Sequence, residues 1–316
     1  MPVRGMTLAH LHRADLGYGS DACRVQLDNL KNLNVNWIAI NPFAYMPQIN
    51  KPGLSFGGDR SMSRNNMIRV VKDAHERGMS VLIKPHIWSG EFARGKSPME
   101  IAMTTDADWD VWFASFTDYI MDNAKLAQES GAEALSVGCE LEGTSKHTER
   151  WKKLIAQVRT VYTGKLVYAA AFEEWKQIEF WEDLDCVGIN AYWPVADVRN
   201  ASDEEVRAGW RNRLASLVTF AKKINRPICF TELGYTLSDK AAMEPWEYAV
   251  ETENAKLQER LYTIALEETR ASGVVVGVFV WKWFTADAWK RHERGDPFAI
   301  QDNAALVERI KHAWMH

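Results

Sequence analysis

The sequence predicts a single (β/α)8 barrel of the TIM type, and three observations lead to this prediction. Short apolar, β-branched runs alternate with longer amphipathic segments along the chain, which is the pattern of parallel strands joined by helical crossovers. We count eight such pairs. The 316 residues, 47% hydrophobic and 25% charged, suit one large globular core. We therefore expect one catalytic domain that spans residues 1–316.

The expected strands are short apolar runs. Several of them are apolar on both faces, as expected for strands that helices cover on the outside and packed side chains fill on the inside. In order along the chain, they cover residues 5–10, 34–41, 80–86, 134–140, 166–171, 186–192, 227–232 and 275–281.

The expected crossover helices are marked by their ends. Segments 63–77, 106–130, 148–163 and 252–272 each stop before a glycine, which takes the left-handed conformation at a helix end without steric cost. These glycines are Gly78, Gly131, Gly164 and Gly273. Two helix starts resemble capping boxes, Thr105 with Asp108 and Ser202 with Glu205. A last helix over 303–314 is expected to close the ring.

Charge and composition exclude several classes of partner. The net charge of -4 gives no basic footprint, which argues against nucleic acid and against an anionic membrane surface. No stretch approaches the roughly 18 apolar residues of a membrane span, and the first residues lack the apolar region of a signal peptide. We expect a cytoplasmic protein, or a secreted or periplasmic one if a signal peptide has been removed, that is a monomer or a weak oligomer.

The four cysteines do not have the spacing of a disulfide framework or a zinc site. Cys139, Cys186 and Cys229 fall in expected strands and Cys23 in a helix. We therefore expect reduced thiols, no metal and no cofactor.

Two glutamates stand at the polar ends of apolar runs. Glu140 closes the fourth expected strand and Glu232 closes the seventh. The carboxyl ends of barrel strands meet at one face, so these two side chains can lie opposite each other. Glycoside hydrolysis needs such a pair, because one carboxylic acid protonates the leaving oxygen while a carboxylate attacks or activates water. We predict that Glu140 and Glu232 are the catalytic pair.

Glu142 competes with Glu140, because residues two apart in a strand point the same way. We prefer Glu140, since it closes the apolar run, and we expect Glu142 on the following loop, where it binds substrate or is solvated.

The other residues at the expected strand ends are polar or aromatic. Aromatic faces stack on the C–H faces of sugar rings, while polar side chains bond to hydroxyl groups. We therefore expect a binding rim for a β-linked oligosaccharide or polysaccharide, made of His10, Asn41, Lys84, His86, Trp88, Glu142, Asn190, Tyr192, Trp193, Trp281 and Trp283. Trp281 is the favoured sugar platform, although strand alternation sends Trp283 the same way.

Structural alternatives stand beside these roles. Lys84 can be a buried cation that neutralises a carboxylate, and Asn41, which precedes Pro42, can be a turn former. Tyr192 either bonds to a catalytic carboxylate or caps the barrel. Trp281 and Trp283 can be packing residues.

Four segments carry a resemblance to a known family. They are Val137-Gly-Cys-Glu-Leu-Glu142, Lys84-Pro-His86, Phe230-Thr-Glu-Leu-Gly234 and Phe298-Ala-Ile-Gln-Asp-Asn-Ala-Ala305. A barrel with glutamates after strands four and seven resembles glycoside hydrolase clan A, and these segments are similar to family 113, known mainly for β-1,4-mannanases. By that resemblance Glu140 is the acid/base and Glu232 the nucleophile of a retaining double displacement. The resemblance implies an endo-β-1,4-mannanase that acts on mannan or manno-oligosaccharides.

The chain departs from the clan at one position. Most members of the clan have an asparagine before the acid/base that bonds to the sugar's 2-hydroxyl, whereas this chain has Cys139, and a thiol bonds weakly. That contact must come from elsewhere, and Asn190, His86 and Lys84 are the candidates. Because mannose and glucose differ at this carbon, an exo-acting β-mannosidase or another β-glycosidase or glucanase of the clan stays open.

Two rivals come from other classes. His10-Leu-His12 resembles the first zinc ligands of metal-dependent amidohydrolase barrels. The chain lacks the further histidines, since it has Ala170-Ala-Phe-Glu173 and Asn190-Ala-Tyr-Trp193 after strands five and six. The second rival is a barrel that binds oligosaccharide without cutting it, against which the presence of both glutamates argues.

Overall fold

The computed structural model of the protein, which describes residues 1–287 and 295–315, is a closed barrel. Its parallel strands follow one another around the ring in the order β1-β11-β10-β9-β8-β7-β5-β2, which confirms the predicted fold class. Each strand overlaps the one expected at its place. Their bounds are β1 (Val3–Ala9), β2 (Trp37–Ile40), β5 (Ser80–Ile83), β7 (Ala134–Cys139), β8 (Lys165–Ala170), β9 (Cys186–Asn190), β10 (Ile228–Leu233) and β11 (Val275–Phe284).

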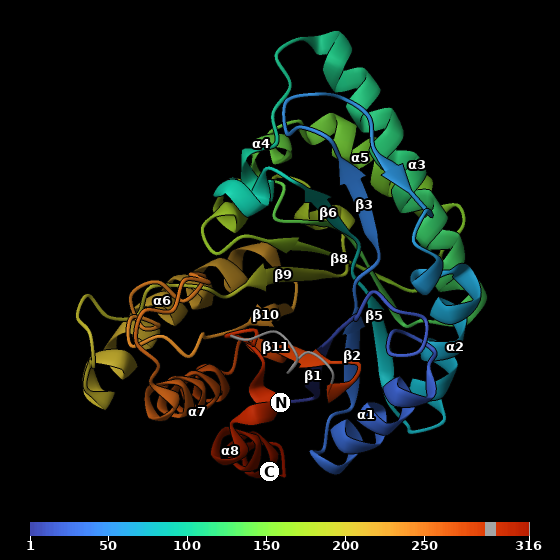
Figure 1. Ribbon diagram of the computed structural model, residues 1–316. Coiled ribbons are helices and arrows are strands. Elements are labelled where there is room, and N and C mark those ends of the chain that lie inside the picture. The colour runs from blue at the N-terminus through green and yellow to red at the C-terminus, as the bar shows by residue number, and fades with distance from the viewer. Residues whose placement is uncertain (288–294, 316) are drawn as a thin grey trace.

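The α-helices lie outside the ring of strands (Figure 1). They are α1 (Asp21–Asn32), α2 (Arg64–His75), α3 (Asp106–Ser130), α4 (Glu142–Ser145), α5 (Thr148–Arg159), α6 (Asp203–Ile224), α7 (Ala255–Ser272) and α8 (Ala304–Ala313). Helix α3 has the predicted bounds: the Thr105 hydroxyl accepts a hydrogen bond from the Asp108 amide, and Gly131 ends the helix with φ 76°. Helix α6 begins at the predicted capping box of Ser202 and Glu205.

Two expectations about the crossovers are wrong. Helix α5 ends at Arg159, several residues before Gly164, which does not have a positive φ. The segment between β8 and β9 contains two 3-10 helices, η4 (Glu174–Lys176) and η5 (Trp181–Asp183), in place of an α-helix. Its buried aromatic residues cover the barrel wall instead; they are Trp175, Phe180 and Trp181.

A small second sheet extends the barrel at the carboxyl ends of β2 and β5. It consists of β3 (Phe43–Met46), β4 (Ser55–Phe56) and β6 (His86–Ser89) in the order β4-β3-β6. Figure 1 shows β3 and β6 beyond the barrel strands that precede them. The remaining short helices are η1 (Arg60–Met62), η2 (Phe92–Arg94), η3 (Pro98–Glu100) and η7 (Ile300–Asp302).

The barrel core has an inner and an outer part. Alternate residues of β2 belong to different parts: Ala39 belongs to the small inner cluster, while Ile38 and Ile40 belong to the large outer one. The inner cluster consists of Ala39, Leu82, Ala134, Val167, Cys229 and Phe279. The four cysteines form no disulfide.

The strand registers shift at a few places. Strand β7 shifts against β8 between Ser136 and Cys139, and β10 shifts against β9 between Phe230 and Glu232. Pairs β1·β2, β2·β5 and β8·β9 are regular. Bulges of this kind re-aim the side chains that follow them. Both glutamates of the predicted pair therefore follow an interruption of the ladder.

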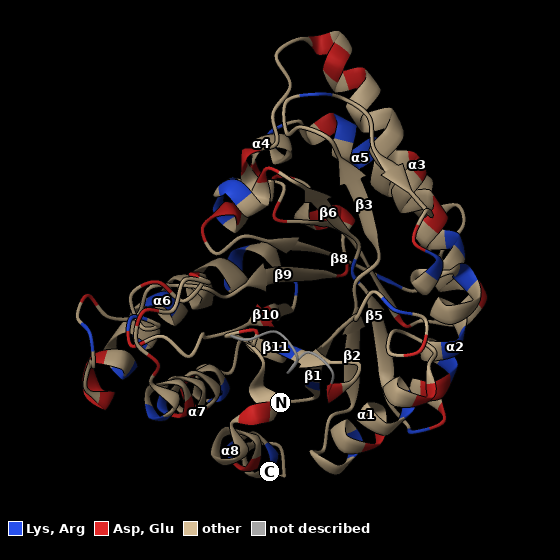
Figure 2. Ribbon diagram, in the orientation of Figure 1, with Lys and Arg blue, Asp and Glu red and all other residues tan. Residues whose placement is uncertain are grey.

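Charged residues of both signs are spread over the outer helices and loops (Figure 2). Among the described residues, no helix is long and apolar enough to span a bilayer. The charged groups that matter for the site are the few buried ones.

Candidate active site

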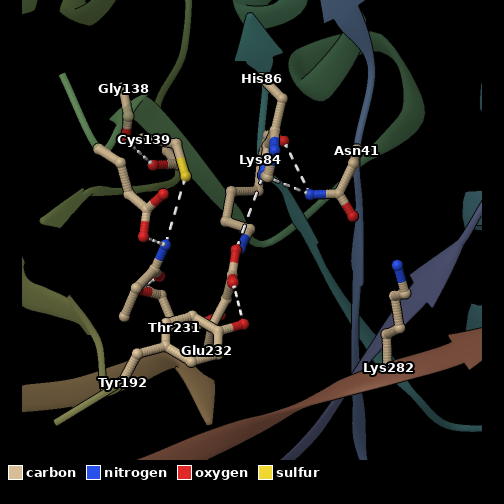
Figure 3. A network of polar contacts seen from close by, with 12 residues as sticks. Asn41, Lys84, His86, Gly138, Cys139, Tyr192, Thr231, Glu232 and Lys282 are labelled. Carbon is tan, nitrogen blue, oxygen red and sulfur yellow. Dashed lines mark hydrogen bonds and ion pairs between the residues drawn. The ribbon is translucent and has the colours of Figure 1, made fainter. Parts of the chain in front are cut away.

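Glu232 is held on both carboxylate oxygens. The residue is 4% exposed, and its Oε1 forms an ion pair with Nζ of Lys84, which is fully buried. Its Oε2 accepts a hydrogen bond of 2.6 Å from the Tyr192 hydroxyl. Figure 3 shows Lys84 and Tyr192 meeting Glu232 from different sides. The Glu232 carboxylate is therefore fixed in position by a buried cation and a hydroxyl donor.

Tyr192 is a donor throughout the ordinary pH range. Burial, and then the negative charge of Glu232, raise the pKa of Tyr192 well above its usual value. The phenol therefore keeps its proton and directs it at the Glu232 carboxylate.

Glu140 has a different environment. Its side chain is partly exposed, and its Oε1 accepts a hydrogen bond of 3.1 Å from the amide of Asn190. That amide is fixed in turn, because its Oδ1 accepts a 2.8 Å bond from the Thr231 hydroxyl. Burial and then the charge of Glu232 raise the pKa of Glu140 to about 7, against the opposing influence of Asn190 and Lys84. Glu140 therefore keeps a proton to a much higher pH than an ordinary glutamate.

A local bulge in β7 aims Glu140. Gly138 has no room for a side chain, because a Cβ there would lie 2.7 Å from the ring of Tyr168 and 2.8 Å from that of Trp151. The Ser136 hydroxyl donates a 2.7 Å hydrogen bond to the Gly138 carbonyl across the bulge. Glu140 then takes a left-handed backbone with φ 54°.

The two carboxyl groups can therefore act in different protonation states. Glu232 is paired with a cation, while Glu140 is paired with a neutral amide and lies under the influence of a negative neighbour. A protonated carboxyl beside an ionised one is the arrangement that a general acid and a nucleophile or base require.

Cys139 supports the Asn190 amide. Its Sγ lies 3.5 Å from Nδ2 of Asn190, which also bonds to Glu140. Burial raises the pKa of Cys139 well above its usual value, so the thiol stays neutral. Because both amide protons and the carbonyl of Asn190 are used by the protein, Asn190 positions Glu140.

Asn41, His86 and Trp281 lie together beside Lys84. The amide nitrogen of Asn41 bonds to Nε2 of His86 at 2.8 Å, while its Oδ1 is buried without a partner among the described residues. The ring of Trp281 is parallel to that of His86, with centroids 6.1 Å apart. Nζ of Lys84 lies 5.3 Å from the centroid of the Trp281 ring. Burial, then Lys84 and Lys282, lower the pKa of His86 well below its usual value.

Two predicted rim tryptophans lie outside the barrel wall. Trp193 packs against Trp210 of α6, and the indole N–H of Trp283 donates a 2.9 Å hydrogen bond to Gln26 of α1. Alternation fails for Trp283 because β11 shifts its register against β1 between Val280 and Trp283. We therefore correct the prediction for both residues, which are packing residues.

Trp88 and Glu142 have partners other than the two catalytic candidates. Trp88 is on β6 of the second sheet, 44% exposed, with its ring against Phe92. Glu142 begins α4 and accepts a 3.1 Å hydrogen bond from Gln177. Neither contacts the two catalytic candidates through a described hydrogen bond.

His10 lies in a hydrogen-bond chain that occupies both of its nitrogens. Nδ1 accepts from the Tyr18 amide at 3.0 Å, so the ring proton is on Nε2, which faces the Ser61 hydroxyl at 2.8 Å. Ser61 donates to Asp59, whose other oxygen pairs with His12. His10, His12 and Asp59 are close enough to surround an ion. In this tautomer His10 has no free lone pair for one, which removes support from the amidohydrolase alternative.

Sequence reasoning missed two further groups of residues on the carboxyl-terminal side of the barrel. Lys282, next to Trp281, forms a 2.8 Å ion pair with Asp296 and lies 5.5 Å from the ring of Tyr248. Trp246, 43% exposed, stacks on Phe172 from another loop. Lys282 and Thr231 could have been found as the neighbours of predicted residues. The stacked pair had no signal, because both members lie on loops.

The family model described as Glycoside Hydrolase Family 113 matches residues 6–301. The chain is similar to the GH113 β-mannanase AaManA from Alicyclobacillus acidocaldarius, with 23% identity over 99% of this chain and 97% of that one, and a TM-score of 0.86. It is also similar to another GH113 β-1,4-mannanase, with 22% identity, coverage of 99% and 98%, and a TM-score of 0.86.

A more distant likeness is to a family 5 mannosidase from Rhizomucor miehei, with 12% identity over 99% and 92% of the two chains and a TM-score of 0.68. No curated protein matches the chain significantly. At these identities, the structural likenesses show the fold.

Proposed function

Because this chain belongs to glycoside hydrolase family 113, we propose that it is an endo-β-1,4-mannanase that cleaves mannan and manno-oligosaccharides with retention of anomeric configuration. Glycoside hydrolysis is the activity of the family. The substrate comes from the relatives, whose descriptions name β-1,4-mannanases.

In the first step, Glu232 attacks the anomeric carbon while Glu140 protonates the glycosidic oxygen. The C–O bond to the leaving sugar breaks and an ester forms between the glycosyl unit and Glu232. Lys84 and Tyr192 hold the attacking carboxylate in place. Glu140 supplies the proton because burial and the nearby charge favour its neutral form.

In the second step, Glu140 acts as a base. Esterification removes the charge of Glu232, which is one of the influences that raise the pKa of Glu140. Glu140 then takes a proton from water, the water oxygen attacks the anomeric carbon, and the ester bond to Glu232 breaks. Two inversions give net retention.

The observation that carries this proposal is the unequal pairing of the two carboxyl groups, cation and phenol for Glu232 and amide for Glu140. Substrate recognition draws on residues beside them. Trp281 is a partly exposed aromatic residue beside Lys84, and aromatic rings of this kind stack on sugar rings.

The test is digestion of a panel of mannans, glucans and short manno-oligosaccharides, with product size followed by chromatography and product anomer by proton NMR. We expect internal cleavage of mannan and an initial β-anomer. An initial α-anomer would contradict the mechanism. Turnover of glucans alone would contradict the substrate, and release of mannose alone would replace endo with exo action.

The same panel separates hydrolysis from binding without catalysis. Mannohexaose that binds the protein in calorimetry and is never cleaved would favour the oligosaccharide-binding barrel. We expect cleavage, because both carboxyl groups are present and held.

A further inference from the structure

A third buried carboxyl group, Glu174, lies behind the site and has no part in the mechanism above. Its side chain is fully buried in η4. Oε1 accepts a 2.5 Å hydrogen bond from the Tyr168 hydroxyl, and Oε2 accepts a 2.9 Å bond from the Ala171 amide. Since buried carboxyl groups are costly unless they are well paired, this one has to be explained.

Tyr168 connects Glu174 to the chain next to Glu140. Its hydroxyl donates to Glu174 and accepts a 3.0 Å hydrogen bond from the backbone amide of Leu141. The amide of Glu140 itself donates a 2.8 Å bond to the carbonyl of Ala169. The two successive amides at the end of β7 are therefore both held by residues of β8.

The backbone of Glu140 requires such restraint. Its φ of 54° lies in the left-handed region, which a glutamate adopts only when the surroundings impose it. Leu141 is 1% exposed, and its bond to Tyr168 gives a buried amide its partner. Without that bond, the peptide that follows Glu140 has no other described acceptor that would keep it in this orientation.

We propose that Tyr168 and Glu174 are positioning residues for the acid/base: Glu174 orients the Tyr168 hydroxyl, and this hydroxyl fixes the Leu141 amide and so the direction of the Glu140 carboxyl. The inference rests on the role of Glu140 in the proposed function. Neither residue touches substrate, since both are fully buried outside the barrel wall.

The ring and the hydroxyl of Tyr168 have separable roles. The ring packs edge-on against Trp151 and Phe180, and it faces Gly138 at the bulge. Removal of the hydroxyl alone leaves this packing in place. Tyr168→Phe is therefore the primary variant.

The chain offers a matched control near the opposite end of β7. Tyr162 is also buried, and its hydroxyl donates a 2.7 Å hydrogen bond to the carbonyl of Ala132, just before β7. Tyr162→Phe removes one buried tyrosine hydroxyl that bonds to the backbone, as Tyr168→Phe does, but far from Glu140 along β7.

The first measurement is kcat/KM on aryl β-mannobiosides with leaving groups from phenol to 2,4-dinitrophenol. This constant reports the step in which Glu140 donates its proton, and good leaving groups do not need that proton. We expect Tyr168→Phe to lose about 10- to 100-fold on the phenyl substrate and less than about threefold on the dinitrophenyl one. Tyr162→Phe should behave like wild type on both.

A uniform loss across leaving groups, or no loss at all, would overturn the proposal. Glu174→Gln provides a second variant if Tyr168→Phe folds poorly. It should steepen the leaving-group dependence in the same direction, because an amide cannot accept from both Tyr168 and Ala171.

The second measurement does not need turnover, so it stands even if aryl mannobiosides are not substrates. The Glu140 carboxyl is titrated by carbon-13 NMR, with Glu140→Gln to assign its signal. The groups that face it are Asn190 of β9, Glu232 of β10, Lys84 just after β5 and Cys139 of β7, with Glu174 behind.

In Tyr168→Phe, we expect the Glu140 carboxyl to titrate at lower pH than in wild type, because a freed side chain reaches solvent and loses the desolvation that raises its pKa. An unchanged titration would overturn the proposal. Failure of the wild-type protein to cleave any mannan substrate would instead overturn the proposed function and leave this measurement valid.

Discussion

The carboxyl ends of β7 and β10 each lead to a glutamate, but the two glutamates have different surroundings. Glu232 on β10 meets a buried lysine and a phenol, and it is nearly inaccessible. Glu140 after β7 meets the neutral amide of Asn190 and is partly exposed. The neighbours on adjacent strands, and not the glutamates themselves, therefore give the two carboxyl groups their different chemical environments.

Loss of the ionised carboxylate should have the largest effect. Glu232→Ala removes the nucleophile, and we expect kcat on an aryl β-mannobioside to fall by a factor on the order of 10⁶. Azide should restore part of the rate and give the α-glycosyl azide, identified by NMR. The exposed Glu182→Ala serves as a control. A rate near that of wild type would end the assignment of Glu232.

Loss of the protonated carboxyl should cost less and depend on the leaving group. We expect Glu140→Ala to lose about 10²- to 10⁴-fold in kcat/KM on the phenyl substrate and little on the dinitrophenyl one. Azide should give the β-glycosyl azide. An α-azide from this variant would mean that the two roles are exchanged.

The cation on the Glu232 side can be tested through stability. Lys84→Met leaves a buried carboxylate without its partner, so we expect a loss of about 3–5 kcal/mol in the free energy of unfolding in urea. Lys84→Met combined with Glu232→Gln should recover much of that loss, because no unpaired charge remains. A double variant as unstable as the single one would show that Lys84 acts through its packing.

The amide on the Glu140 side should give the smallest effect, a shift of pH dependence. Glu140 has to be protonated to act as an acid, and its pKa is raised to about 7, so wild-type kcat/KM should fall as pH rises through this value. Asn190 favours the ionised form. Asn190→Ala should therefore move the alkaline limb to higher pH, as measured by kcat/KM from pH 4 to 9. A downward move would contradict the described role of the amide.

Much of the fold could be predicted, because parallel strands and their crossovers leave a strong apolar pattern. Every barrel strand overlaps the expected one, and the bounds of α3 agree with expectation. The β8–β9 connection could not be predicted as it is, since its aromatic residues pack through two 3-10 turns without helical periodicity. The second sheet has short strands, and its pairing depends on the barrel below it.

The candidate site was predictable where it lies at strand ends. The resemblance to family 113 is confirmed by the family model, and Lys84 and Tyr192 lie against Glu232. The catalytic roles of Glu140 and Glu232 stay predictions until the variants are measured. Trp283 was placed wrongly because strict alternation does not survive a register shift.

Contacts behind the barrel wall were not predictable. Tyr168 belongs to an apolar strand, and its hydroxyl becomes significant only because β7 bulges toward it at Gly138. Nothing in the sequence near Glu174 distinguishes it from the half-buried Glu173 and the exposed Glu179.

The interrupted registers have a consequence for hydrogen exchange. Strand pairs β1·β2 and β8·β9 keep regular ladders, whereas β7 and β10 shift just before their glutamates. Amides of regular ladders open only with large parts of the protein, while amides beside a break can open locally. Deuterium should therefore enter the carboxyl ends of β7 and β10 before it enters the middle of β2. The part of the barrel that carries the catalytic glutamates would then also be the part that opens locally.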